Sequence, residues 1–101
     1  MLSDSRRNPR YRCALPAVVD GPRGALRGTC TNVSLEGLFF EGPSLAVGVT
    51  VSLTLDLGHR GKLRVQAQVR NQLPGGMGVQ FTRFEPGQAE ALQQLIVSLP
   101  K

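Results

Sequence analysis

Apolar and polar residues alternate through most of this chain, a pattern that predicts short β-strands. The alternation is cleanest in Val49–Leu57, where every second residue is apolar and the residues between them are Thr, Ser or Asp. It recurs in Lys62–Gln72, where apolar residues alternate with Arg and Gln. Half-buried strands show this period because successive side chains point to opposite faces. The predicted strands are Tyr11–Asp20, Ala25–Val33, Gly37–Glu41, Val49–Leu57, Lys62–Gln72 and Met77–Phe84.

Glycine and proline separate these strands. The Gly21-Pro22-Arg23-Gly24 turn joins the first two as a hairpin, and Pro16 indicates an edge position or a bulge in the first. After Phe84 the apolar period becomes helical, and Pro86 suits the first helical position. This order predicts an antiparallel barrel or sandwich, with the helix over one open end or on the wall. The apolar stripe of the predicted helix is Ala89, Leu92, Leu95, Ile96 and Leu99.

Length and composition indicate one globular domain. The chain has 101 residues, of which 41% are hydrophobic and 19% charged, a balance that argues against disorder. No apolar run approaches the roughly 18 residues that a membrane helix needs. Met1–Pro9 is too polar to be a secretory signal. We therefore expect a cytoplasmic protein without membrane insertion.

Candidate catalytic and metal-binding residues are sparse. His59, the one histidine, lies in a turn between glycines, and the scattered acidic residues form no acid/base pair, so we expect no enzyme. Cys13 and Cys30 lie in predicted strands and lack the Cys-x-x-Cys spacing of a metal site. We expect two buried thiols and no metal. A disulfide is the alternative, so the redox state of this pair stays open.

The charge is strongly positive and concentrated near the N-terminus. The formal net charge is +5, and ten of the twelve basic residues are Arg. Arg6, Arg7, Arg10 and Arg12 fall within seven residues. A guanidinium grips phosphate or a guanine edge at two points, so this cluster indicates an anionic partner, with a solvated basic tail as the alternative. Residues 1–10 are predicted to form a flexible arm.

A small polar loop, Asn32-Val33-Ser34-Leu35-Glu36-Gly37, joins the second and third predicted strands. In an extended chain the side chains of Asn32 and Ser34 point to one face. Gly37 permits a turn or a close approach that a Cβ atom would block. The loop can therefore either hydrogen-bond a ligand or serve as a turn.

Two motifs together resemble those of the PilZ domain family. Arg6 and Arg10 match an Arg-x-x-x-Arg pattern, and Asn32, Ser34 and Gly37 match an [Asp/Asn]-x-Ser-x-x-Gly pattern about twenty residues later. A Gly-Met-Gly-Val-Gln-Phe strand and a final helix follow, so the resemblance covers Ser5 to about Leu99. It implies a mainly β fold, a six-stranded antiparallel β-barrel with a C-terminal α-helix over residues 11–101. It also implies a bacterial receptor that binds cyclic di-GMP, needs no other cofactor and signals to a partner protein.

The resemblance also implies residue roles. Arg6 and Arg10 would grip phosphate oxygens or the guanine O6/N7 edge, while Arg7 and Arg12 would raise the local positive field. Asn32 and Ser34 would hydrogen-bond guanine, and Gly37 would give backbone room. The predicted ligand-binding set is Arg6, Arg7, Arg10, Asn32, Ser34 and Gly37. Two positions depart from the common pattern: Asn32, where Asp is common, and Asn71, near which many members have an aromatic residue.

Two other functions compete with this one. A small basic barrel that binds single-stranded nucleic acid would combine basic grooves with surface aromatics. The aromatic residues here fall mostly at core-like positions, so nucleic acid is disfavoured. A nucleotide-independent PilZ-like adaptor is the other alternative, and the intact motifs argue against it. The downstream partner and the outcome, whether motility, polysaccharide secretion or transcription, stay open.

Overall fold

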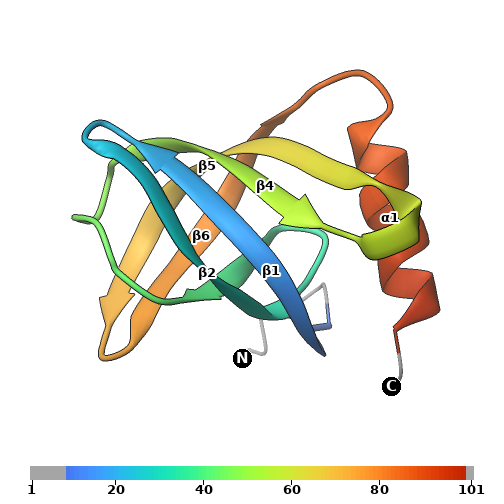
Figure 1. Cartoon of the computed structure of the whole chain (residues 1–101), viewed down its shortest axis with the longest axis horizontal. Coiled ribbons are helices and arrows are strands. Elements are labelled where there is room, and N and C mark those ends of the chain that lie inside the picture. Colours follow the sequence, from blue (N-terminus) through green and yellow to red (C-terminus); the bar gives the residue numbers. More distant parts are fainter. Residues whose placement is uncertain (1–8, 100–101) are drawn as a thin grey trace, which may run out of the picture.

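Six antiparallel strands close into a barrel in the computed structural model, which describes residues 9–99 (Figure 1). Around the barrel the strands follow the order β1-β2-β3-β6-β5-β4, and the pairing of β1 with β4 closes the ring. The predicted fold class is confirmed. The elements are β1 (Tyr11–Gly21), β2 (Gly24–Val33), β3 (Gly37–Glu41), β4 (Thr50–Asp56), a 3-10 helix (Gly58–Arg60), β5 (Lys62–Leu73), β6 (Gly76–Phe84) and α1 (Gln88–Ser98).

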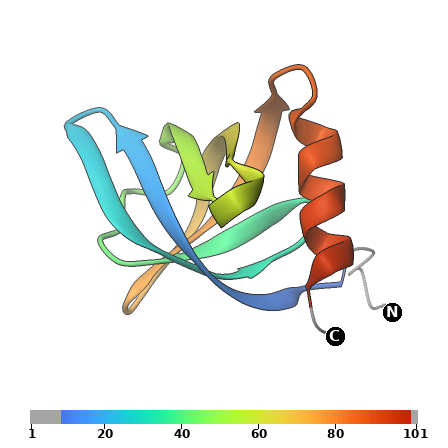
Figure 2. The same ribbon diagram turned by 45° about the vertical axis from the view of Figure 1, so that its right-hand side comes forward.

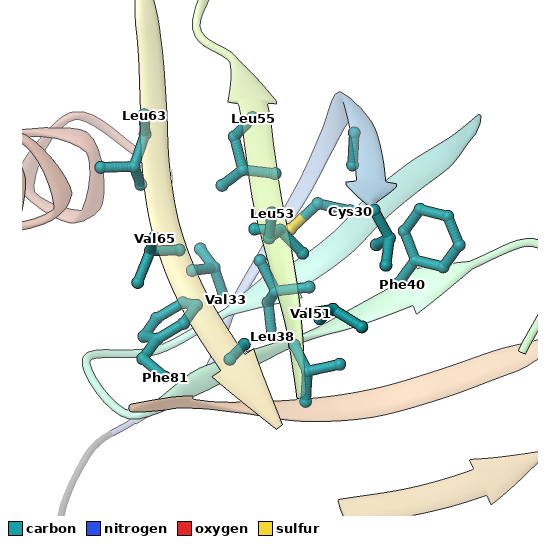
Figure 3. Close-up of a cluster of buried hydrophobic side chains, with 14 of the residues drawn as sticks. Cys30, Val33, Leu38, Phe40, Val51, Leu53, Leu55, Leu63, Val65 and Phe81 are labelled. Atoms are coloured by element: carbon teal, nitrogen blue, oxygen red, sulfur yellow. The ribbon is translucent and has the colours of Figure 1, made fainter. Parts of the chain in front are cut away.

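The core lies inside the barrel and follows the predicted alternation. On β4 the side chains of Val51, Leu53 and Leu55 point inward and are buried, while the residues between them face outward. Figure 3 shows these side chains packed with others from the neighbouring strands. Removing each such side chain from water stabilises the fold by about 1.5–3 kcal/mol. The strand pattern is therefore explained by burial on one face only.

The helix α1 stands beside one open end of the barrel (Figure 2). Its Leu92 and Leu95 are buried and belong to the same core as the strands. The expected helix start and stripe need correction at two residues. The helix begins at Gln88, because Gly87 with a φ of 82° turns the chain just before it, so Pro86 precedes the helix. Ala89 is exposed, and Ala91 packs against the core in its place.

Bulges interrupt the ladders at defined places. On β1 one extra residue lies between Arg12 and Leu15, next to Pro16. Pairing of β1 with β4 begins only at Ala17, so the missing N–H of Pro16 removes no bond from that ladder. The bulge that Pro16 indicated is therefore present, and it precedes the proline.

The β1–β2 hairpin determines which parts of the chain meet. It closes where Gly21 lies opposite Gly24, and its far end pairs Tyr11 with Val33. The residue before β1 therefore lies next to the loop that follows β2. This register places Arg10 and the loop Asn32–Gly37 at one end of the same hairpin.

Two leucines on neighbouring strands test how much of the stability comes from the inward face. Leu53 is 1% exposed and Leu73 is 48% exposed. We expect Leu53→Ala to lower the free energy of unfolding by about 2–5 kcal/mol, because it leaves a cavity. Leu73→Ala should change it by less than about 1 kcal/mol. Urea unfolding followed by circular dichroism measures both, and equal losses would contradict the assignment of the core.

Candidate functional site

The two predicted halves of the site meet through Arg10 and Asn32. The Nη1 atom of Arg10 donates a hydrogen bond to Oδ1 of Asn32 at 2.7 Å. Arg10 immediately precedes β1, and Asn32 lies near the end of β2 opposite Arg12. The hairpin register brings the pair together. Arg10 is exposed, and a guanidinium has five N–H donors, so further donors remain available to a ligand.

Ser34 stabilises the loop from within. It is 3% exposed, and its hydroxyl oxygen accepts hydrogen bonds from the backbone N–H groups of Glu36 at 3.1 Å and Gly37 at 3.3 Å. The Ser34 N–H donates to the Gly37 carbonyl at 2.8 Å and closes the turn. Asn32 and Ser34 therefore differ: the amide of Asn32 faces Arg10, and the hydroxyl of Ser34 faces its own loop.

Gly37 lies against β6 with no room for a side chain. A Cβ atom at this position would overlap the carbonyl oxygen of Val79. The loop is tied to β6 on the same side, because the Phe81 N–H donates to the Glu36 carbonyl at 2.7 Å. Of the two roles that the sequence allows for this glycine, the structure shows close approach, since Gly37 is the first residue of β3 and pairs with Gln80.

An open hollow of about 240 Å³ lies beside this loop. Its charged side chains are two guanidinium groups, from Arg10 and Arg70, and one carboxylate, from Glu36. Guanidinium groups suit phosphate oxygens and the guanine O6/N7 edge, and a carboxylate accepts N–H donors such as those of a guanine base. The lining consists of Arg10, Glu36, Gly37, Arg70, Asn71, Val79 and Gln80.

Arg70 is the site residue that sequence reasoning missed. An extra residue on β5 between Val69 and Asn71 interrupts the ladder with β6 at this point. Arg70 and Asn71 are consequently both exposed, although strict alternation would turn one of them inward. Arg70 Nη1 donates to Gln80 Oε1 at 2.7 Å across the two strands. The alternation places Arg70 on the outer face, but no signal in the sequence indicates the bulge.

Other expected groups lie elsewhere. Arg6 and Arg7, and with them most of the predicted arm, lie outside the described residues. Arg12 is exposed on β1, and His59 is exposed in the 3-10 helix. Residues 9–99 contain no group of three or more His, Cys, Asp and Glu side chains that could hold a metal ion. Among the same residues, no helix has the length and apolar character to cross a membrane.

Comparison with protein families gives one match that spans almost the whole chain. The family model described as PilZ domain matches residues 4–98. No curated protein matches the chain.

Solved structures with the same fold share little sequence with this chain. The PilZ domain of YcgR from Escherichia coli, solved with c-di-GMP, has a TM-score of 0.81 at 18% identity, covering 95% of this chain and 92% of that one. The PilZ domain of CeSA from a cellulose-synthesizing bacterium has a TM-score of 0.72 at 17% identity, with 88% and 95% covered. The Bacillus subtilis inhibitor of motility MotI/DgrA has a TM-score of 0.78 at 19% identity, with 94% of this chain covered. This chain spans 51% of MotI/DgrA, about half its length.

Substitution of two serines tests whether the Ser34 hydroxyl stabilises the loop, with a surface serine as the comparison. We expect Ser34→Ala to lower the free energy of unfolding by about 1–3 kcal/mol, because one buried and one partly buried N–H group lose their acceptor. Ser52→Ala, at an exposed position on β4, should change it by less than about 0.5 kcal/mol. Thermal and urea unfolding measure both. If Ser34→Ala unfolds like the wild-type protein, the hydroxyl does not stabilise the loop.

Proposed function

The chain belongs to the PilZ domain family, and on this basis we propose that it is a receptor for the bacterial second messenger cyclic di-GMP. The observation that supports this most directly is the hydrogen bond from Arg10 to Asn32, which joins the two motifs beside the hollow. The PilZ domain of YcgR, which shares the fold, was solved with c-di-GMP. We place the ligand in the hollow bounded by Arg10, Gly37 and Arg70.

The charges of the hollow suit both parts of a guanine nucleotide. Arg10 and Arg70 offer forked donors for a phosphate group or for guanine O6 and N7. Glu36 offers a carboxylate that can accept the N–H groups of a guanine base. With two cationic side chains against one anionic side chain, the hollow favours an anion over a cation.

Asn32 has two functions in this proposal. Its Oδ1 atom holds Arg10 in place before the ligand arrives, which reduces the ordering that binding requires. Its amide NH₂ group can donate to guanine O6. Ser34 contributes through the loop that it stabilises. Gly37 has no side chain, so it lets that loop lie close to β6.

Residues 1–10 complete the proposed receptor as an arm in front of the barrel of residues 11–101. Arg6 and Arg7 would add guanidinium groups to the open side of the hollow. Ligand binding would then order the arm against the barrel, and its new position would be the signal to a partner protein. Ordering the arm costs conformational entropy, so the affinity for the ligand would be lower than the contacts alone would give.

The aromatic residues favour a nucleotide over single-stranded nucleic acid. Phe40 and Phe81 are buried, and Tyr11, Phe39 and Phe84 are half-buried. The rings of Phe81 and Phe84 pack edge to face with centroids 5.5 Å apart, so each ring is in contact with the other. A barrel that binds single strands needs exposed rings on which bases can stack.

Isothermal titration with cyclic di-GMP tests the proposal. Arg10→Ala should weaken binding about 10- to 100-fold, because hydrogen bonds to a charged group are lost. Arg23→Ala is the matched control, since Arg23 is exposed in the turn at the other end of the hairpin. It should leave the affinity within about twofold. If the wild-type protein shows no binding at micromolar concentrations, or both variants lose affinity equally, the proposal is wrong.

Arg70 provides a second test, on a residue outside both motifs. We expect Arg70→Ala to weaken cyclic di-GMP binding about tenfold, because one guanidinium leaves the hollow. Arg64→Ala removes the same group from an exposed position on the same strand, and its affinity should match the wild type. Unfolding curves check that both variants keep the fold. An unchanged affinity in Arg70→Ala would exclude Arg70 from the binding site.

A further inference from the structure

Two thiols face each other beside the proposed site. The Sγ atoms of Cys13 and Cys30 are 3.5 Å apart, and both cysteines are free. Cys30 is 0% exposed and lies in the barrel core, as Figure 3 shows, whereas Cys13 is half-buried. One member of this thiol pair can therefore be reached from solvent, and the other is enclosed behind it.

The thiol pair is directly connected to the binding residues. Cys13 lies in the β1 bulge, three residues after Arg10. The Cys30 thiol donates to the Asn32 carbonyl oxygen at 3.3 Å, and the Cys13 thiol donates to the Cys30 carbonyl oxygen at 3.3 Å. Cys13 thus follows Arg10 by three residues and Cys30 precedes Asn32 by two, so the thiol pair adjoins both binding residues.

We propose that Cys13 and Cys30 are a modification site, which a low-molecular-weight disulfide oxidises to an intramolecular disulfide bond that weakens nucleotide binding. The distance supports this assignment, because a disulfide bond is about 2.05 Å long and the two sulfur atoms are already in contact. Rotation of the two side chains and a small shift at the β1 bulge can close the remaining gap.

The reaction is two successive thiol–disulfide exchanges. The Cys13 thiolate attacks one sulfur of the oxidant, forming a mixed disulfide and releasing the first small thiolate, which takes the proton that Cys13 gave up. Cys30 then loses its proton and attacks the Cys13 sulfur, which releases the second small thiolate to take that proton. The two protein thiols are oxidised to one disulfide, and the oxidant is reduced to two thiols.

The acidities of the pair agree with this order. When Cys13 is deprotonated, the Cys30 S–H can donate to the Cys13 thiolate in place of the Asn32 carbonyl oxygen. This hydrogen bond lowers the pKa of Cys13, so Cys13 is the thiol that forms the attacking thiolate. The pKa of Cys30 is strongly raised by its hydrogen bond to Cys13, by burial and by the charge on Cys13. Once Cys13 is capped as a mixed disulfide, its charge is gone, and that part of the rise in the pKa of Cys30 disappears.

Oxidation should disturb Asn32 first. The disulfide removes both S–H groups, so the Asn32 carbonyl loses the donor that Cys30 supplied. Drawing the sulfur atoms together would also shift the backbone at the β1 bulge, which begins two residues after Arg10. Because Asn32 Oδ1 positions Arg10, we expect the affinity for cyclic di-GMP to fall about fivefold, the equivalent of one hydrogen bond. This last step rests on the proposed function, whereas formation of the disulfide does not.

Intact-mass spectrometry of the full chain tests the disulfide. After treatment with bis(2-hydroxyethyl) disulfide, the wild-type protein should lose two hydrogen atoms and retain no adduct. Cys30→Ser should stop at a single hydroxyethylthio adduct on Cys13, and Cys13→Ser should remain unmodified because Cys30 is enclosed. A wild-type protein that stays unmodified, keeps an adduct or forms covalent dimers would overturn the proposal.

Titration with cyclic di-GMP then tests the effect on binding. Oxidised wild-type protein should bind about fivefold more weakly than reduced protein, and dithiothreitol should restore the affinity. Cys13→Ala, treated with the same oxidant, should bind equally before and after treatment. Equal affinities for the oxidised and reduced wild-type protein overturn the effect on binding. No binding by the reduced protein instead overturns the proposed function, while the mass measurement still decides whether the disulfide forms.

Discussion

The antiparallel pairing of β1 with β2 is the constraint on which the candidate site depends. Because the hairpin closes between Gly21 and Gly24, the chain that enters β1 must pass the loop that leaves β2. Arg10 and Asn32 are 22 residues apart in sequence, yet one hairpin brings them into hydrogen-bond contact. The rest of the barrel supports this arrangement: β3 and β6 hold the loop from the other side through Gly37 and the bond from Phe81 to Glu36.

Bulges on β1 and β5 change the strand register next to the candidate site. The extra residue on β1 changes the partner of Arg12 from Val33 to Asn32. The extra residue on β5 turns both Arg70 and Asn71 outward. On β5 the single inserted residue changes which side chains face the hollow, and on β1 it changes which residues lie opposite each other near Asn32, while the core alternation continues on either side. The barrel therefore keeps its packing, and the polar surface is set by a few local irregularities.

Much of the fold could be predicted from the sequence, because burial on one face produces a period that is visible in residues such as Val51 to Leu55. The predicted helix start at Pro86 is too early, because Gly87 adopts a left-handed conformation and the helix begins only after it. The contact between Arg10 and Asn32 follows from the hairpin and the two motifs. Arg70 could not be found in this way, because a bulge on β5 is a property of pairing with β6 and leaves no pattern in either strand alone.

Closure of the barrel limits where a partner protein could attach to this domain. Each strand in the described part of the chain has two paired neighbours, but β1 pairs with β4 only over residues 17–20, so the β4 side of residues 11–16 is the stretch of β1 that a partner's strand could extend. In the proposed receptor, a signal would therefore pass through side chains, loops, chain ends or the open start of β1, because the rest of the barrel wall is already hydrogen-bonded.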